Sequence, residues 1–242
     1  MGGNKSAVLT YHSIDPSGSV ISTYPELFRR QMSLLAERVV PVVALAQVRQ
    51  TPGALALTFD DGYRNFETEA LPVLEKYRFP ATVFVVTGRC GQSKDWAPRQ
   101  GIMPPLALMD WEALRRVAAA GVELGAHTVS HPVLPSLSEE AAERELRECR
   151  DELQHRLGKP VRAVSYPYGI SNPAVRRVAA RHYQLACGTK LGYVSEHSDP
   201  WDLRRIDAYY LRRANLFEHV TTGQGGAYLA LRRLLRILRG RP

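Results

Sequence analysis

Residues 55–62, Leu-Ala-Leu-Thr-Phe-Asp-Asp-Gly, join a run of apolar side chains to two adjacent carboxylates and a glycine. A short apolar run that ends in a turn residue is typical of a strand buried in a parallel sheet. Leaving Asp60 and Asp61 there without a partner would cost several kcal/mol each, so we expect a cation beside them. An Asp-Asp-Gly turn by itself, however, more often caps the following helix.

Similar apolar runs recur along the chain and are separated by segments of helical length. The expected strands are 8–12, 55–60, 81–86, 122–127, 162–167 and 184–188. The expected helices are 67–77, 110–120, 138–157 and 172–182, with Asp110, Ser138 and Asn172 as N-caps. Repeated strand-helix units predict an α/β fold with a parallel sheet, closed into a barrel-like domain. We assign this domain to residues 1–213, followed by a basic amphipathic extension at 214–242.

Polar residues stand at the carboxyl ends of four of these strands. They are His12, Asp60 with Asp61, His127, and the turn at 166–169. Because the carboxyl ends of parallel strands lie at one edge, we expect these residues to form one site. Successive strand residues point to opposite sides, so one aspartate could bind a metal while the other addresses a water.

His127 and His131 stand four residues apart, close enough for both imidazoles to bind one ion. A lone histidine pair is more often structural. Together with a remote aspartate, however, it supplies three metal ligands and leaves coordination positions for water and substrate. Two histidines and a carboxylate also form the facial triad of non-haem iron oxygenases. Those enzymes usually carry a close His-x-Asp pair on an antiparallel barrel, which this sequence lacks. A serine hydrolase is disfavoured because the chain has no Gly-x-Ser-x-Gly motif.

Three segments together resemble the ordered motifs of the polysaccharide deacetylases, the NodB-homology or carbohydrate esterase 4 family. They are LTFDDGYRN at 57–65, GVELGAHTVSHPVL at 121–134 and SYPYG at 165–169. The resemblance covers nearly the whole chain and implies a distorted (β/α)7-type barrel. It also implies that Asp60 is the catalytic base and that Asp61, His127 and His131 hold a divalent metal. Zinc is the ion we expect, and cobalt, manganese, nickel and iron stay open.

The resemblance also assigns roles around the turn at Pro167, Tyr168 and Gly169. The backbone N–H of Tyr168 would stabilise the oxyanion, and its two neighbours would hold the turn. Family members often place an arginine two positions before this proline to orient the base. This sequence has Ser165 there, and Arg205 in WDLRRID is the candidate replacement.

The family's general acid is a histidine on a late strand with a Leu-x-His pattern, and no segment with this pattern follows Arg205. The N-terminal segment VLTYHSI at 8–14 instead resembles the circularly permuted branch that acts on poly-N-acetylglucosamine-type polysaccharides. His12 would then be the acid. The implied reaction is metal-dependent removal of N-acetyl groups from a polysaccharide or lipid-linked glycan. A carbohydrate-binding relative without turnover is the alternative, and Trp96 is the aromatic residue we expect to stack on a sugar.

The net charge of +8 is concentrated near the C-terminus, where nine arginines from residue 204 onward face only Asp207 and Glu218. Residues 228–238 predict a helix with Leu231, Leu234, Leu235 and Leu238 on one face. This helix could dock on the barrel or on a membrane surface, and we expect no nucleic-acid partner. The sequence shows no leader peptide or membrane span, and its three cysteines lack metal or disulfide spacing. The expected location is cytoplasmic, with peripheral membrane contact left open.

Overall fold

A seven-stranded parallel sheet forms the centre of the molecule, with the strand order β8-β7-β6-β5-β4-β1-β9. The structure is a computed structural model that describes residues 5–93 and 106–238. The strands of the sheet are β1 (Ala7–Tyr11), β4 (Leu55–Phe59), β5 (Ala81–Val85), β6 (Glu123–Ala126), β7 (Ala163–Ser165), β8 (Leu185–Cys187) and β9 (Ile206–Asp207). The parallel α/β arrangement predicted from the alternating segments is confirmed, and all six expected strands are present.

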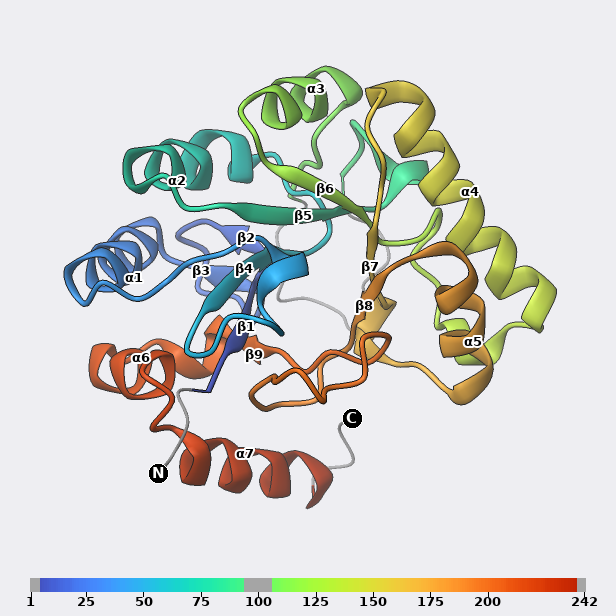
Figure 1. Cartoon of the computed structure of the whole chain (residues 1–242). Coiled ribbons are helices and arrows are strands. Elements are labelled where there is room, and N and C mark those ends of the chain that lie inside the picture. The colour runs from blue at the N-terminus through green and yellow to red at the C-terminus, as the bar shows by residue number, and fades with distance from the viewer. Residues whose placement is uncertain (1–4, 94–105, 239–242) are drawn as a thin grey trace.

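Helices surround the outside of the curled sheet (Figure 1). They are α1 (Pro25–Glu37), α2 (Leu71–Tyr77), α3 (Trp111–Ala119), α4 (Glu139–Leu157), α5 (Pro173–His182), α6 (Ala214–Thr221) and α7 (Gly226–Leu238). A π-helical turn, Phe66–Ala70, precedes α2, so the helix expected at 67–77 begins irregularly. The side chains of Asp110, Ser138 and Asn172 each accept a hydrogen bond from a backbone N–H in the first turn of α3, α4 and α5.

Several elements escaped the sequence prediction because their signals are short or mixed. Strands β2 (Ser13–Ile14), β3 (Ser22–Thr23) and β9 have two residues each, which is too few for an alternation pattern. Helices α1 and α6 were also not predicted. Phe28 on α1 and Phe217 on α6 are fully buried, so both helices belong to the main core.

Alternate residues of the central strands face two different hydrophobic clusters. On β4, Leu55, Leu57 and Phe59 join the large cluster under the helices, whereas Ala56 joins a smaller one that includes Phe84 and Ala163. A strand side chain points to the opposite side from its neighbours, so Asp60 continues the series that starts at Ala56. This parity aims the first aspartate toward the inside of the curled sheet.

Helices α6 and α7 lie beyond β1 and β9, at the bottom of Figure 1. Val220 of α6 and Leu229 of α7 are buried in the large cluster. The domain boundary expected between residues 213 and 214 stays a prediction. Among the described residues, no helix is both long and apolar enough to cross a membrane.

Candidate metal centre

Asp61, His127 and His131 bring their ligand atoms within 4.8 Å of one another, and all three side chains are buried. His127 Nε2 lies 3.4 Å from Asp61 Oδ1, and His131 Nε2 lies 3.6 Å from the same oxygen. Two ligands of a tetrahedral zinc, each roughly 2.1 Å from the ion, stand about 3.4 Å apart. The spacing of these donors therefore fits a single tetrahedral ion.

The tautomer of His127 also suits a metal ligand. Its Nδ1 lies 2.7 Å from the carbonyl oxygen of Ser165. A carbonyl can only accept, so Nδ1 carries a proton, and Nε2, which faces Asp61, is the nitrogen that would bind a metal once its own proton has left. Burial alone would lower the pKa of His127, but hydrogen bonding to Asp61 and the charges of Asp60 and Asp61 raise it. The same negative potential favours a bound cation.

A sharp turn separates the two aspartates after β4. Asp61 has φ 71° and Gly62 has φ 76°, so both adopt the left-handed conformation that most residues avoid. The turn directs Asp61 to the histidines, while Asp60 faces inward. Burial together with the nearby charge of Asp61 raises the pKa of Tyr63, which keeps its hydroxyl protonated. The sequence analysis did not single out Tyr63, although it follows the Asp-Asp-Gly turn directly.

Asp60 forms a buried ion pair with Arg205 that uses both carboxylate oxygens. The guanidinium NH1 lies 2.7 Å from Oδ1, and NH2 lies 2.7 Å from Oδ2. Arg205 is 1% exposed and Asp60 is 4% exposed. Burial alone would raise the pKa of Asp60, but Arg205 outweighs this effect and lowers it to about 2. Asp60 is therefore ionised at neutral pH.

Ser165 hydrogen-bonds to both partners of this ion pair. Its hydroxyl donates to Asp60 Oδ2 at 3.2 Å and accepts from Arg205 NH2 at 2.8 Å. Arg205 precedes β9, while Ser165 ends β7, so the guanidinium reaches the aspartate from a different strand. The arginine missing from position 165 thus has a counterpart in space.

His12 follows β1 at the same sheet edge, and its charge is one of the influences that lower the pKa of Asp60. The segment after His12 is tied to the loop after β4 by Asn65. The amide Nδ2 of Asn65 donates to the Ser13 hydroxyl at 2.6 Å, and its Oδ1 accepts from the Ile14 N–H at 3.1 Å. Asn65 was not singled out from the sequence, because an asparagine after a turn has many structural uses.

The turn at 166–169 lies against the histidines. Tyr168 has φ 58° and ψ 5°, and its ring packs edge-on against His131 with centroids 4.7 Å apart. Gly169 has φ 68°, and a Cβ atom at this position would lie 2.1 Å from the Thr189 hydroxyl oxygen. Pro167 is buried. Trp96, expected to stack on a sugar, lies outside the described residues.

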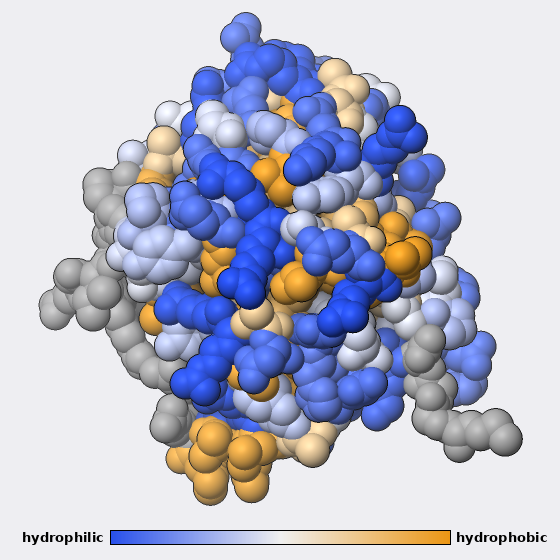
Figure 2. Space-filling view, turned by 90° about the vertical axis from the view of Figure 1, so that its left-hand side faces the viewer, coloured by the Kyte–Doolittle hydropathy of each residue, from blue (hydrophilic) through white to orange (hydrophobic). Residues whose placement is uncertain are grey.

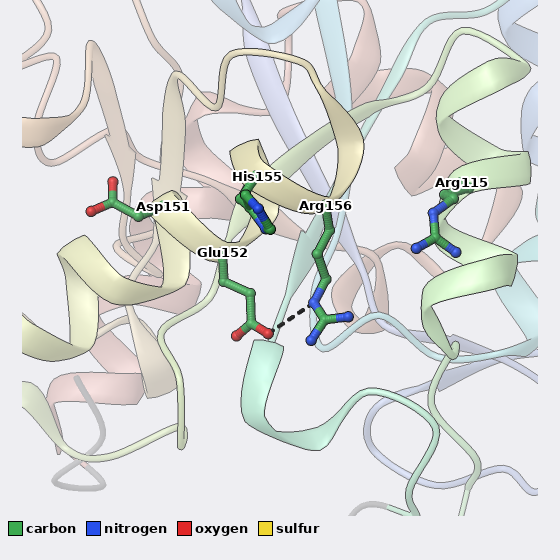
Figure 3. Close-up of a pocket in the computed structure, with 5 residues that line it drawn as sticks. All are labelled: Arg115, Asp151, Glu152, His155 and Arg156. Atoms are coloured by element: carbon green, nitrogen blue, oxygen red, sulfur yellow. Dashed lines mark hydrogen bonds and ion pairs between the residues drawn. The ribbon is translucent and has the colours of Figure 1, made fainter.

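One surface hollow of about 600 Å³ lies away from these residues (Figure 3). It is lined by Arg115 on α3 and by Asp151, Glu152, His155 and Arg156 on α4. The four α4 residues come from the last turns of that helix, which run back to the amino end of the next strand. Glu152 and Arg156 pair with each other across 3.0 Å. The hollow therefore lies between α3 and α4, and none of the aspartates and histidines of the metal set lines it.

The sequence model of one protein family, polysaccharide deacetylase, matches residues 47–185 of this chain. This stretch contains the two aspartates, both histidines and the turn at Pro167. The chain belongs to the polysaccharide deacetylase family. The predicted family is thereby confirmed, and relatives of this deacetylase are carbon-nitrogen hydrolases that act on polysaccharides, chitin and peptidoglycan.

Three individual similarities extend over most of the chain. YxkH of Bacillus subtilis, named after the same family, is 25% identical over 211 residues, covering 84% of this chain and 71% of its own. The Streptococcus pyogenes deacetylase PplD, solved in complex with acetate, superposes with a TM-score of 0.73 at 25% identity, covering 85% of this chain and 93% of that one. IcaB from Ammonifex degensii gives a TM-score of 0.76 at 21% identity, covering 92% and 98%. The fold match confirms the predicted (β/α)7-type barrel.

Other relatives match shorter segments of this deacetylase. They include enzymes named for chitin, chitooligosaccharides and poly-β-1,6-N-acetyl-D-glucosamine. This chain spans less than two thirds of the length of each of these relatives. Together with the buried aspartate and histidines, they support the predicted metal-dependent deacetylase.

Proposed function

We propose that this protein hydrolyses N-acetyl groups on an N-acetylhexosamine-containing polysaccharide or glycan. The observation that carries the proposal is the buried set of Asp61, His127 and His131, whose facing atoms are 3.4 and 3.6 Å apart, beside the ionised Asp60. A carbohydrate-binding relative would not need an ionised carboxylate held by a buried arginine next to a metal set. The paired Asp60 therefore favours the enzyme over the binding module.

Asp61 Oδ1 and the Nε2 atoms of His127 and His131 would hold the metal, which we expect to be zinc. When bound, such an ion would polarise the acetyl carbonyl and lower the pKa of a water. Cobalt, manganese, nickel and iron accept the same nitrogen and oxygen donors. The choice among them depends on metal supply as well as on these side chains.

Asp60 is the base in the proposed reaction and accepts a proton from the attacking water. A carboxylate with a pKa near 2 is a weak base by itself, so a water of lowered pKa must complement it. Arg205 is a positioning residue, because it grips both oxygens of Asp60 and keeps the carboxylate charged and oriented. Its burial argues against direct contact with the sugar.

Tyr168 and His12 complete the proposed machinery, as the oxyanion donor and the general acid. The backbone N–H of Tyr168 donates to the oxyanion that develops on the carbonyl, an interaction worth about 3 kcal/mol for one donor. His12 protonates the departing amine, because an amine anion cannot leave. Acetate and a free amino sugar are the products. Pro167 and Gly169 hold the turn that carries Tyr168, and Trp96 stays a candidate for stacking on the sugar.

The substrate is proposed from the relatives, which are named for chitooligosaccharides and poly-β-1,6-N-acetyl-D-glucosamine. The test is to strip metal from the protein with a chelator, restore zinc, and measure acetate released from both kinds of N-acetylated oligomer. Release is expected only with the ion, and Asp60→Asn should abolish it without loss of zinc. A fully zinc-loaded protein that releases acetate from neither oligomer would favour the binding module.

We further propose that α7 contacts an anionic membrane surface. Such a contact would bring the protein to a lipid-linked glycan. The cytoplasmic location expected from the sequence is a separate prediction. Leu231, Leu234 and Leu238 are 56%, 53% and 72% exposed. Figure 2 shows a hydrophobic patch at the lower edge of the molecule, where α7 lies in Figure 1. The opposite side of α7 packs on the protein through Leu229, which is 3% exposed.

Two arginines of α7 lie on its protein side and do not shield these leucines. The guanidinium of Arg232 lies 5.2 Å from the centre of the Tyr210 ring, and NH1 of Arg236 donates to the Thr189 carbonyl at 2.9 Å. Arg233 is exposed, and α7 contains no acidic residue. Apolar side chains with only basic neighbours on their helix fit an anionic lipid surface better than a second copy of the same positive helix.

A further inference from the structure

A glutamate on α4 holds the loop that joins the two histidines. Glu145 Oε2 accepts hydrogen bonds from the backbone N–H groups of Val129 and Ser130, each at 2.9 Å. Its other oxygen accepts from the Ser130 hydroxyl at 2.7 Å. One carboxylate therefore binds three donors of a loop that lies between residues 127 and 131. Hydrogen bonds to a charged acceptor are stronger than those between neutral groups.

The loop needs such support because its backbone is strained at two places. Thr128 has φ 69° and His131 has φ 61°, and neither is a glycine. Residues with a Cβ atom rarely adopt this left-handed conformation, and they keep it only where the surroundings enforce it. Within the loop, the His131 N–H donates to the Thr128 hydroxyl at 3.0 Å. His131 thus reaches its place beside Asp61 through a backbone that would relax if released.

The opposite side of the loop is fixed by the segment after β5. The N–H of Gly88 donates to the Val129 carbonyl at 2.9 Å, and the N–H of Thr87 donates to the Thr128 carbonyl at 3.3 Å. A Cβ atom on Gly88 would lie 2.7 Å from that Val129 oxygen, so the two segments are in close contact. The carbonyls of the loop are therefore bound on the β5 side and its N–H groups on the α4 side.

Other glutamates of α4 have a different environment. Glu148 pairs with Arg147, and Glu152 pairs with Arg156, both on the surface of the same helix. Pairs of this kind contribute little to stability and leave the rest of the fold unaffected. Glu145 differs because its carboxylate is bonded to the histidine loop. An ordinary solvated helix residue would not bind two consecutive backbone N–H groups of another segment.

We propose that Glu145 is a positioning residue for the metal centre. It fixes the loop so that His131 stays beside His127 and Asp61, and it acts without touching any of the three. The inference rests on the proposed function only in taking these side chains as metal ligands. Residues that support metal ligands in this way typically change metal affinity by roughly 10- to 100-fold when they are replaced.

Zinc affinity tests this role directly. Chelator-treated protein is titrated with zinc chloride in competition with a chromogenic chelator, for wild type, Glu145→Ala, Glu145→Gln and Ser130→Ala. Glu145→Ala should raise the Kd for zinc roughly 10- to 100-fold. Glu145→Gln should stay within about threefold, because its amide oxygen can still accept both N–H groups. Ser130→Ala removes only the hydroxyl bond and should fall between them. Glu148→Ala, on the same helix, is the matched control and should leave the Kd unchanged.

Hydrogen exchange of the Val129 and Ser130 amides gives a second measurement that needs no metal. Both amides should exchange faster in Glu145→Ala than in wild type and Glu148→Ala. If wild type binds zinc tightly and the Kd of Glu145→Ala is unchanged, the proposed role of Glu145 is wrong, but the metal centre still stands. Failure of wild type to bind zinc would overturn the metal centre and this role together. If Glu145→Ala does not fold, an unchanged Kd in Ser130→Ala overturns the proposal.

Discussion

Arg205 and Asp60 meet through two parallel hydrogen bonds of 2.7 Å inside the curled sheet. They are 145 residues apart in the chain, and the pair joins the segment before β9 to the end of β4. A buried ion pair of this geometry is costly to break from one side, because the remaining charge is left without a partner. The pair therefore matters for the stability of the fold as well as for the charge of the proposed base.

The first prediction concerns stability and pH. The folded-state pKa of Asp60 is about 2, below its ordinary value of 3.8, so ionised Asp60 stabilises the fold above about pH 4. This contribution is lost as the pH falls through 2. The free energy of unfolding of wild type should exceed that of Asp60→Asn most at neutral pH. The difference should shrink by about 2 kcal/mol toward pH 2.

Denaturant unfolding at a series of pH values, with a chelator present, measures this difference. The chelator matters because Asp60 adjoins a proposed metal ligand. A stability difference that stays constant from pH 7 to pH 2 would argue against a lowered pKa and against the pair with Arg205.

His12→Ala separates protonation of the leaving group from the rest of the reaction. Loss of a general acid should slow acetate release from an N-acetylated sugar by about 10²- to 10⁴-fold. Hydrolysis of an activated aryl acetate should change little, because its leaving group needs no proton. His155→Ala, an exposed histidine at the hollow in Figure 3, should affect neither substrate. Equal losses on both substrates would show that His12 does not act as the acid.

Gly169→Ala tests the turn that carries Tyr168. The new Cβ atom would collide with Thr189 at 2.1 Å, and the φ of 68° adds strain. Gly158→Ala is the matched control, since its φ is 64° and no atom lies within 4 Å of the added Cβ. Thermal unfolding should show a loss of about 1 kcal/mol for the control and more for Gly169→Ala. Only Gly169→Ala should also lower kcat, and equal kcat in both variants would contradict the role of the turn.

Replacing Leu231 and Leu234 together by Asn tests the membrane contact of α7. Wild type should sediment with phosphatidylglycerol vesicles and less with phosphatidylcholine vesicles, and the double variant should lose most of this binding. Val39→Asn is the control, because Val39 is 83% exposed on another part of the surface. Sedimentation unchanged in the double variant would exclude the leucine face. Wild-type dimers that the variant abolishes would assign this face to a second copy instead.

Much of the fold could be predicted because its strands are long enough to show a pattern. Segments such as Leu55–Phe59 and Ala81–Val85 are continuous apolar runs that end in turns. Strand β9 has two residues and follows an irregular stretch, so periodicity could not reveal it. Helix α7 was predicted, but the orientation of its leucines was not. The helical pattern gives an apolar face, but it does not say whether that face packs on the barrel or faces solvent.

The candidate site shows the same limit. The residues that carry chemistry stand in short motifs after strands, and Asp61, His127 and His131 come together in space. Residues that support them reach across the chain by hydrogen bonds that no spacing indicates. Glu145 resembles any other glutamate of an exposed helix, and Asn65 resembles any turn residue. Arg205 stood out only because the expected arginine was missing at Ser165.

Diffraction from crystals grown with zinc, recorded on both sides of the zinc absorption edge, tests the metal centre most directly. The predicted result is one anomalous peak about 2.0–2.2 Å from Nε2 of His127, Nε2 of His131 and a carboxylate oxygen of Asp61. A zinc-saturated protein with no peak among these three side chains would contradict the proposed metal-dependent deacetylation.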